Sequence, residues 1–453
     1  MPGILGALRP VMLLALAVVF VLLVAFIFRS CRSERASPGG AGDLYVPPDS
    51  GGAPTSFSGL ASPSGGVSEA DFMDIPVLMT ERITQDSVEG VAVGRLNPDG
   101  TSYLVAGTDL RGTRRSLGFR VYDLEGGFLW EHLFTGASYR TTQAGYQAGG
   151  RYIVASAVTY GEAGVVMVLE ANGAHVFERS FDGWAEAVLS DDGKWLALFN
   201  HRRRTLEVLG PRRYSPAWSA NVGSGAWGLF TPAGDGLLVC EAGRARMFDQ
   251  RGQLMWSQDI PDGGRWNAAF SPDGRFLAAT TEDPDSSVYL YSVTDGSLVW
   301  KQFLVTGGNK HTAFSPNGRL LVVYDVGKHA AIYMLDAATG EIPWRFYLRG
   351  REDATLAVAD LDFAPSGDYM IADIVESTVA EDAYHYYHYL LRLTIDGRAL
   401  WVSPLGGEAD VDIDVRHGLA LITSNNPLDA YGNVENTITL LRFQTDAPPA
   451  GGS

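Results

Sequence analysis

The feature that most constrains this chain is an internal repeat that begins after the first 70 residues. A glycine stands between two short apolar runs at Gly100, Gly150, Gly193, Gly234, Gly274, Gly318 and Gly367, with a weaker eighth copy at Gly418. The seven clear copies are 40 to 50 residues apart. In several copies the turn reads Pro-Asp-Gly or Pro-Asn-Gly, where proline presets φ and glycine accepts the positive φ of a tight turn. Each copy therefore predicts a β-hairpin.

A second signature closes each unit with a large aromatic residue after another turn glycine. In five units this residue is a tryptophan: Trp130, Trp256, Trp300, Trp344 and Trp401. In two units with a weaker copy of the signature, Phe177 and Trp218 occupy the same position. Each unit holds four short strands, and nothing beyond the N-terminus shows helical periodicity. Four-stranded units at this period predict an all-β fold, a β-propeller over residues 71–445.

The repeat also predicts how the ring closes. Eight inner hairpins are present, but only seven outer strands carry the aromatic residue. We expect residues 75–84 to supply the missing outer strand to the last blade, residues 410–443. Eight blades are predicted on this count, with seven as the alternative.

The N-terminus has a different character. After a short tail, residues 1–10, residues 11–28 form an apolar run without charge, proline or glycine. As a helix these 18 residues would span about 27 Å, close to the hydrocarbon thickness of a bilayer. We predict an uncleaved transmembrane helix, with a cleaved signal peptide as the alternative. Residues 29–70 are rich in Gly, Ser and Pro and predict a flexible linker, and residues 446–453 predict a disordered tail.

Two parts of the repeat resemble known propeller families. Residues 335–344, LDAATGEIPW, resemble the repeat of pyrroloquinoline-quinone-type propellers, the quinoprotein-like superfamily, and the Ser-Pro-Asp-Gly hairpins resemble WD40 or TolB-type repeats. The resemblance implies a propeller. Its non-enzymatic members include the propeller lipoprotein of the outer-membrane protein assembly machinery. Its enzymatic members bind the quinone with calcium, a catalytic Asp and adjacent cysteines. This chain has only Cys31 and Cys240, so we expect no cofactor and no enzyme.

The side of the membrane is open at this stage. Arg29, Arg32 and Arg35 follow the apolar run, whereas only Arg9 precedes it. By the positive-inside rule this places the propeller in the cytoplasm. The family resemblance favours an extracytoplasmic propeller, and we expect a single-pass cell-membrane protein of that orientation.

Charge and motifs exclude several functions. The net charge of −17 argues against nucleic-acid binding, which needs a basic face. Asp410, Asp412 and Asp414 alternate with apolar residues and share one strand face. They indicate either a cation site or a wet acidic lining of the central channel, and we favour the lining. We therefore predict no metal site.

The binding surface is expected on one rim. Trp184, Trp227 and Trp266 lie seven to nine residues before the turn glycine of consecutive blades, which places them at the start of three inner strands. Loops on the same rim carry arginines and, farther round, carboxylates: Arg111, Arg114, Arg115, Arg202, Arg203 and Arg204, then Glu282, Asp283, Asp285, Glu376, Glu381 and Asp382. Aromatic residues and arginines are enriched in binding hot spots, although inter-blade packing and solvated loops would explain them equally well.

These observations favour a membrane-anchored, non-catalytic propeller that acts as a scaffold or recognition module at the cell envelope. Its partner would be a protein or envelope ligand on the rim. The alternative is a quinone-dependent dehydrogenase-like oxidoreductase.

Overall fold

The computed structural model describes residues 67–71 and 81–443, apart from short gaps at 90–91, 110–115, 135–138, 160–162, 261–265, 282–284, 305–308, 327–329, 350–353, 381–382, 408 and 428–433. Within these residues all regular structure is β-strand. No helix in this part of the chain is long and apolar enough to cross a membrane. The predicted transmembrane segment, residues 11–28, lies outside the described residues, as do most of the linker and the C-terminal tail.

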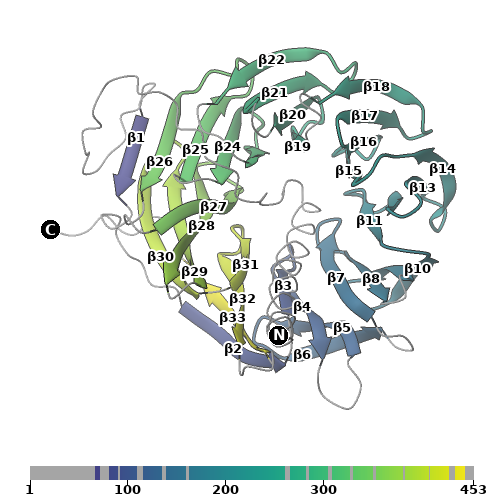
Figure 1. Cartoon of the computed structure of the whole chain (residues 1–453), viewed down its shortest axis with the longest axis horizontal. Helices are drawn as coiled ribbons and strands as arrows, with labels where there is room; N and C mark the ends of the chain where they lie inside the picture. The colour runs from purple at the N-terminus through teal and green to yellow at the C-terminus, as the bar shows by residue number, and fades with distance from the viewer. Residues whose placement is uncertain are drawn as a thin grey trace, which may run out of the picture.

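The described strands form a ring of eight four-stranded blades, as the repeat predicts (Figure 1). Seven blades, the alternative, is wrong. Blade 1 is β3(Ala92–Leu96), β4(Ser102–Asp109), β5(Ser116–Asp123) and β6(Phe128–Phe134). Blade 2 is β7(Tyr139–Gln147), β8(Tyr152–Thr159), β9(Gly164–Glu170) and β10(His175–Phe181). Blade 3 is β11(Ala185–Leu189), β12(Leu196–Asn200), β13(Thr205–Gly210) and β14(Ser215–Asn221). Blades 4 and 5 are β15(Trp227–Phe230), β16(Gly236–Glu241), β17(Arg244–Asp249) and β18(Leu254–Asp259), then β19(Trp266–Phe270), β20(Phe276–Thr281), β21(Ser287–Ser292) and β22(Leu298–Phe303). Blades 6 and 7 are β23(Asn309–Phe314), β24(Leu320–Val326), β25(Ala330–Asp336) and β26(Trp344–Arg349), then β27(Ala354–Phe363), β28(Tyr369–Ala380), β29(Ala383–Thr394) and β30(Ala399–Gly407).

Blade 8 closes the ring with a strand from the other end of the propeller. It contains β31(Ala409–Asp414), β32(Leu419–Pro427) and β33(Val434–Arg442), and its outer strand is β2(Glu81–Glu89), antiparallel to β33. Closure by an N-terminal strand is therefore confirmed, but the strand lies later than the predicted residues 75–84. Because β2 and β33 come from opposite ends of the repeat region, the closing sheet ties the two ends together.

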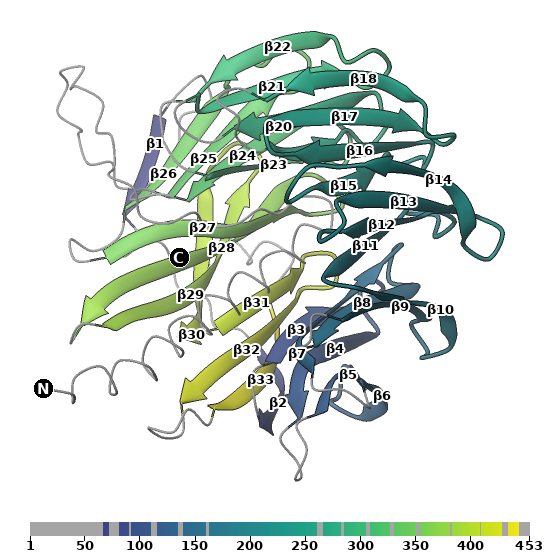
Figure 2. The same cartoon turned by 45° about the vertical axis from the view of Figure 1, so that its right-hand side comes forward.

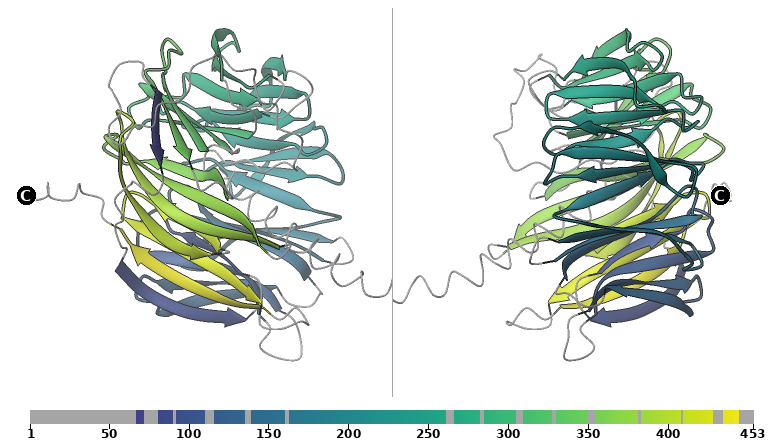
Figure 3. Two further views of the ribbon diagram at one scale, coloured as in Figure 1. Left: turned by 60° about the vertical axis from the view of Figure 1, so that its left-hand side comes forward. Right: turned by 90° about the vertical axis from the view of Figure 1, so that its right-hand side faces the viewer.

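One strand of the structure has no counterpart in the repeat. β1(Val67–Asp71) pairs in parallel with β26, the outer strand of blade 6, from Val67 opposite Arg345 to Asp71 opposite Arg349 (Figures 1 and 3). It begins within the residues that we assign to the linker. The side chains of β26 show no exposed position, whereas the outer strands β14, β18 and β22 are largely exposed.

Antiparallel strands give the ring two rims. The turns between first and second strands and between third and fourth strands lie on one, which we call the turn rim. The loops between second and third strands and the connections between blades lie on the other, the loop rim. Figure 2 shows the strands of blades 3 to 5 stacked side by side between these rims.

The core lies between blades, where four outer tryptophans pack on a turn of the next blade. Trp256 Nε1 donates to the carbonyl of Val293 at 2.7 Å, and Trp130, Trp300 and Trp344 make the same contact with the following blade. Gly296, at φ +70°, lies under the Trp256 ring, so close that an added Cβ would lie 2.7 Å from its Cγ. Glycine is required here by both the backbone angle and the space.

Candidate functional site

The three predicted tryptophans lie at the start of inner strands in adjacent blades. Trp184 directly precedes β11, while Trp227 and Trp266 are the first residues of β15 and β19. The side chain of Trp266 lies outside the described residues. Trp227 packs partly against the core between blades 4 and 5, so inter-blade packing explains much of its position. Trp184 belongs to no core cluster in the described part of the chain, and it is half-buried at the loop rim.

A polar network fixes Trp184 to the neighbouring loop. Its Nε1 donates to Glu186 Oε1 at 2.9 Å, and Glu186 Oε2 lies 3.3 Å from His201 Nε2. The backbone N–H of His201 donates in turn to the carbonyl of Trp184 at 3.1 Å. The inner strand and the loop between β12 and β13 are therefore joined at the rim. Sequence reasoning missed Glu186 and His201, although Glu186 follows Trp184 at the two-residue spacing of one strand face.

The same loop presents the predicted arginines to solvent. Arg202, Arg203 and Arg204 are all exposed, and Asn200 orders the loop by accepting the backbone N–H of Arg203 at 2.9 Å. Arg204 has φ +54°, a left-handed angle that costs a non-glycine residue about 1 kcal/mol or more. All three arginines therefore present exposed side chains at the loop rim of blade 3.

Arg203 is held by an ion pair across the gap to blade 2. Its Nε lies 2.9 Å from Asp182 Oδ1, and both side chains are about half exposed or more. The hydrogen bond from Arg203 holds the pKa of Asp182 below its ordinary value, so this carboxylate is charged at neutral pH. Because the pair is exposed, it positions the guanidinium and adds little to stability.

The other rim residues predicted from the sequence are less informative. Arg111, Arg114, Arg115, Glu282, Asp283, Glu381 and Asp382 lie outside the described residues. Asp285 is bound by Lys301, Tyr289 and Thr281. The expectation for Glu376 is wrong: it lies within β28, is buried, and accepts a hydrogen bond from Tyr389, because β28 runs farther than the loop we expected.

The three aspartates of β31 do not line a wet channel, which corrects the interpretation we favoured. Asp412 is buried and accepts the backbone N–H of Leu96 at 2.7 Å, and Asp410 pairs with Arg95 at 2.6 Å. Asp414 binds His417 in its own turn. Asp410 and Asp412 thus contact β3 of blade 1, so they join the last blade to the first. No group of three or more metal-ligating side chains occurs among the residues that the structure describes.

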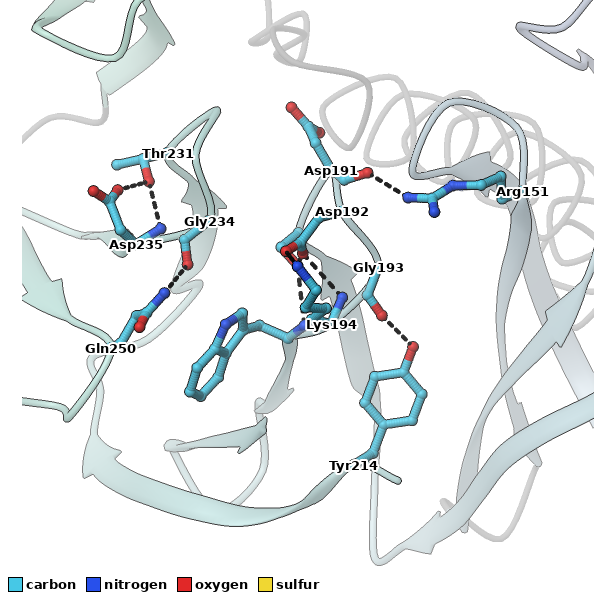
Figure 4. A network of polar contacts seen from close by, with 12 residues as sticks. Arg151, Asp191, Asp192, Gly193, Lys194, Tyr214, Thr231, Gly234, Asp235 and Gln250 are labelled. Atoms are coloured by element: carbon cyan, nitrogen blue, oxygen red, sulfur yellow. Dashed lines mark hydrogen bonds and ion pairs between the residues drawn. The ribbon is translucent and has the colours of Figure 1, made fainter. Parts of the chain in front are cut away.

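The turn rim uses its polar side chains to bind turns of the chain itself (Figure 4). Arg151 donates from blade 2 to the carbonyl of Asp191 in blade 3 at 2.8 Å, and Tyr214 donates to the carbonyl of Gly193 at 2.7 Å. Lys194 pairs with Asp192 at 2.7 Å. Burial raises the pKa of Asp192, but hydrogen bonds from Lys194 and Ser190 outweigh it and leave the pKa lowered. This part of the turn rim is a stabilising network, which leaves the loop rim as the candidate binding surface.

Repeat and fold together define an eight-bladed β-propeller whose repeats resemble those of PQQ-type and WD40 propellers. A family model described as outer membrane protein assembly factor BamB matches residues 241–420, from the end of β16 into β32. No curated protein matches the chain in sequence.

Several solved structures are similar to this chain at low sequence identity. The crystal structure of a eukaryotic initiation factor is 13% identical, with a TM-score of 0.50 over 69% of this chain and 78% of that chain. BamB from Moraxella catarrhalis is 13% identical, with a TM-score of 0.49 over 81% of this chain and 100% of that chain. The hydrazine synthase of Kuenenia stuttgartiensis is 16% identical, with a TM-score of 0.41 over 52% and 75% of the two chains. The first of these likenesses supports the propeller fold and nothing beyond it.

Proposed function

We propose that this chain is a membrane-anchored, non-catalytic propeller that acts as a scaffold or recognition module at the cell envelope. The observation that carries the proposal is the loop rim of blade 3, where exposed Arg202, Arg203 and Arg204 stand beside Trp184. Arginine and tryptophan on a rigid scaffold are the side chains that most often dominate protein interfaces. The BamB family model supports a role in assembly, since that family is described as an outer membrane protein assembly factor.

The anchor in this proposal is the apolar run of residues 11–28, which is joined by the linker to β1 and β2. The same family description supports a propeller outside the cytoplasm. The arginines after the apolar run favour the opposite side. Protease accessibility of the propeller in intact cells distinguishes the two orientations.

Substitution tests the binding surface. Trp184→Ala and Arg203→Ala should abolish capture of the partner and leave the melting temperature nearly unchanged, because both side chains are partly exposed and lie outside the core clusters. Arg275→Ala, at an exposed turn-rim position, is the matched control. A large loss of stability in the rim variants, or unchanged capture, contradicts the proposal. Dye-linked dehydrogenase activity after addition of calcium and pyrroloquinoline quinone would favour the oxidoreductase instead.

A further inference from the structure

A cleft opens between blades 2 and 3, next to the arginine loop. Its volume is about 580 Å³, within the usual range of ligand pockets. Residues of β10, β12, β13 and β14 and of the adjoining loops line it, among them Phe181, Leu198, Pro216 and Trp218. The cleft therefore has apolar surface at its walls and reaches the loop rim at Asp182 and Arg203.

The outer strand of blade 3 has a small side chain where it lines the cleft. A β-bulge precedes the docking aromatic of most blades, and in blade 3 the bulged residue is Ala217, between Pro216 and Trp218. The same bulge position holds Leu129 in blade 1, Met255 in blade 4 and Val299 in blade 5. Alanine fills least of this position, and Ala217 lines the cleft.

The cleft also lies in the most basic stretch of an acidic chain. Residues 200–221 contain five arginines and a single acidic residue, Glu207, whereas the whole chain carries a net charge of −17. All five arginines are exposed: Arg202, Arg203, Arg204, Arg212 and Arg213. They lie at the two ends of β13, so they bracket the length of the cleft. An anionic partner is repelled by most of the molecule and attracted here, which orients its approach.

Two ion pairs cross the cleft, and both leave their arginines within reach. Arg179 of β10 pairs with Glu207 of β13, and the Arg179 side chain is 30% exposed. Arg203 pairs with Asp182 and is 66% exposed. A carboxylate from a partner can replace Asp182 as the acceptor of Arg203, because an exposed pair costs little to separate.

We propose that this cleft binds an extended, acidic segment of a partner polypeptide. Apolar side chains of the segment contact the accessible lining residues Phe181, Pro216 and Ala217, and its carboxylates pair with Arg203 and with the neighbouring Arg204. A concave surface with apolar walls suits a chain segment better than a flat lipid headgroup layer. The inference rests on the proposed function, since it names the kind of partner that the loop rim of blade 3 receives.

Fluorescence anisotropy on the full chain in phosphatidylcholine nanodiscs tests the proposal, with empty nanodiscs as the blank. The probe is a fluorescein-labelled decapeptide of alternating glutamate and leucine, and its counterpart has lysine in place of glutamate. We expect binding of the glutamate peptide alone. Arg203→Ala should weaken binding of the glutamate peptide about tenfold, because roughly one charge-assisted contact is lost. Ala217→Trp should weaken it by about the same factor, because the larger side chain fills the cleft.

Matched variants separate the cleft from general effects. Met255→Trp changes the same bulge position in blade 4, and Arg275→Ala removes an exposed arginine from the turn rim, so both should bind the peptide within about twofold of the native chain. Melting curves of all four variants identify any that fail to fold, and Arg203→Ala, being exposed, keeps the test valid if Ala217→Trp unfolds. Equal binding of the lysine peptide, or no effect of either cleft variant, overturns the proposal.

Two further readouts distinguish peptide binding in the cleft from lipid binding, and failure of the cleft proposal from failure of the proposed function. Sedimentation with phosphatidylglycerol vesicles that depends on Arg203, without peptide binding, would identify a lipid surface and overturn the inference. The second readout is photo-crosslinking in intact cells, with a photoreactive amino acid in place of Arg204. A protein adduct that persists in Ala217→Trp would support the proposed function and reject the cleft as the binding site. If the chain forms no protein adduct from position 204 and does not bind the peptide, both the proposed function and the cleft proposal are rejected.

Discussion

At the scale of single residues, the propeller depends on turn glycines that pack against the tryptophan side chain of the preceding blade. Gly296 and Gly149 both have positive φ, at +70° and +66°. They differ in their surroundings, since a Cβ at Gly296 meets the Trp256 ring whereas one at Gly149 has nothing within 4 Å among the described residues. The pair separates the backbone cost of losing glycine from the cost of displacing the tryptophan.

We expect Gly149→Ala to lower the free energy of unfolding by about 1 kcal/mol, the cost of the backbone angle. Gly296→Ala should cost about 2–4 kcal/mol, because the methyl group also overpacks the Trp256 contact. Urea unfolding of both variants measures the difference. Equal urea midpoints for the two variants would show that the contact between Gly296 and the Trp256 side chain does not stabilise the junction between blades 4 and 5.

A second residue-scale prediction concerns Asp285, which accepts hydrogen bonds from Thr281, Tyr289 and Lys301 at 2.6 to 2.8 Å. Burial raises the pKa of Asp285, but these bonds outweigh it and hold the pKa below its ordinary value of 3.8. A depressed carboxyl pKa contributes stability that is present above pH 3.8 and is lost as the pH falls through the folded-state pKa.

Asp285→Asn should therefore be less stable than the native chain at pH 6, and the gap between the two should shrink as the pH falls below 4. Thermal melts across this range measure it. A gap that stays constant with pH, or widens on the acidic side, would mean that the charge of Asp285 does not contribute.

At the scale of elements, local signals predicted the blades well and non-local pairings poorly. Turn glycines and outer aromatics predict hairpins because they act within a few residues. The closing strand was placed too early, since only its pairing with β33 sets the bounds of β2. β1 was not predicted, because its sequence VSEAD has no apolar alternation and its order comes from the edge of β26. The aspartates of β31 share one face as predicted, but the sequence does not tell which neighbour that face meets.

The candidate site divides in the same way. The tryptophans and Arg202–Arg204 were placed on one rim by counting from the turn glycines, because strand length is regular. Asp182 and Glu186 were missed, since their roles arise from contacts with the loop between β12 and β13. The cleft could not be predicted either, because residues of four strands from two blades line it.

Shortened chains test closure at the element scale. A chain that begins at Val67 keeps β1 and β2 and should unfold cooperatively. A chain that begins at Leu78 loses only β1 and should stay folded with modestly lower stability, because β26 then has a free edge. A chain that begins at Ala92 also loses β2, which leaves β33 unpaired and the ring open, and should be insoluble or lose cooperative unfolding.

Circular dichroism melts and sedimentation of the three chains give the result. If the chain that begins at Ala92 melts like the chain that begins at Leu78, the closing strand is dispensable and the two ends of the ring are held by other contacts.

At the scale of the whole molecule, the two rims differ in how their polar side chains are used. The turn rim of blades 2 to 4 binds its own turns through Arg151, Tyr214 and Lys194 (Figure 4). The loop rim of blade 3 holds three exposed arginines above a cleft. Under the proposed function, the propeller would bind its partner through the loop rim of blade 3.

Site-specific photo-crosslinking in intact cells tests the proposed binding function most directly. A photoreactive amino acid replaces Arg204 on the loop rim or Arg319, an exposed residue on the turn rim, in the full-length chain. We predict one discrete protein adduct from position 204, lost when Arg203→Ala is added, and none from position 319. No adduct at 204, or the same adduct from both positions, would contradict a binding surface on the loop rim of blade 3.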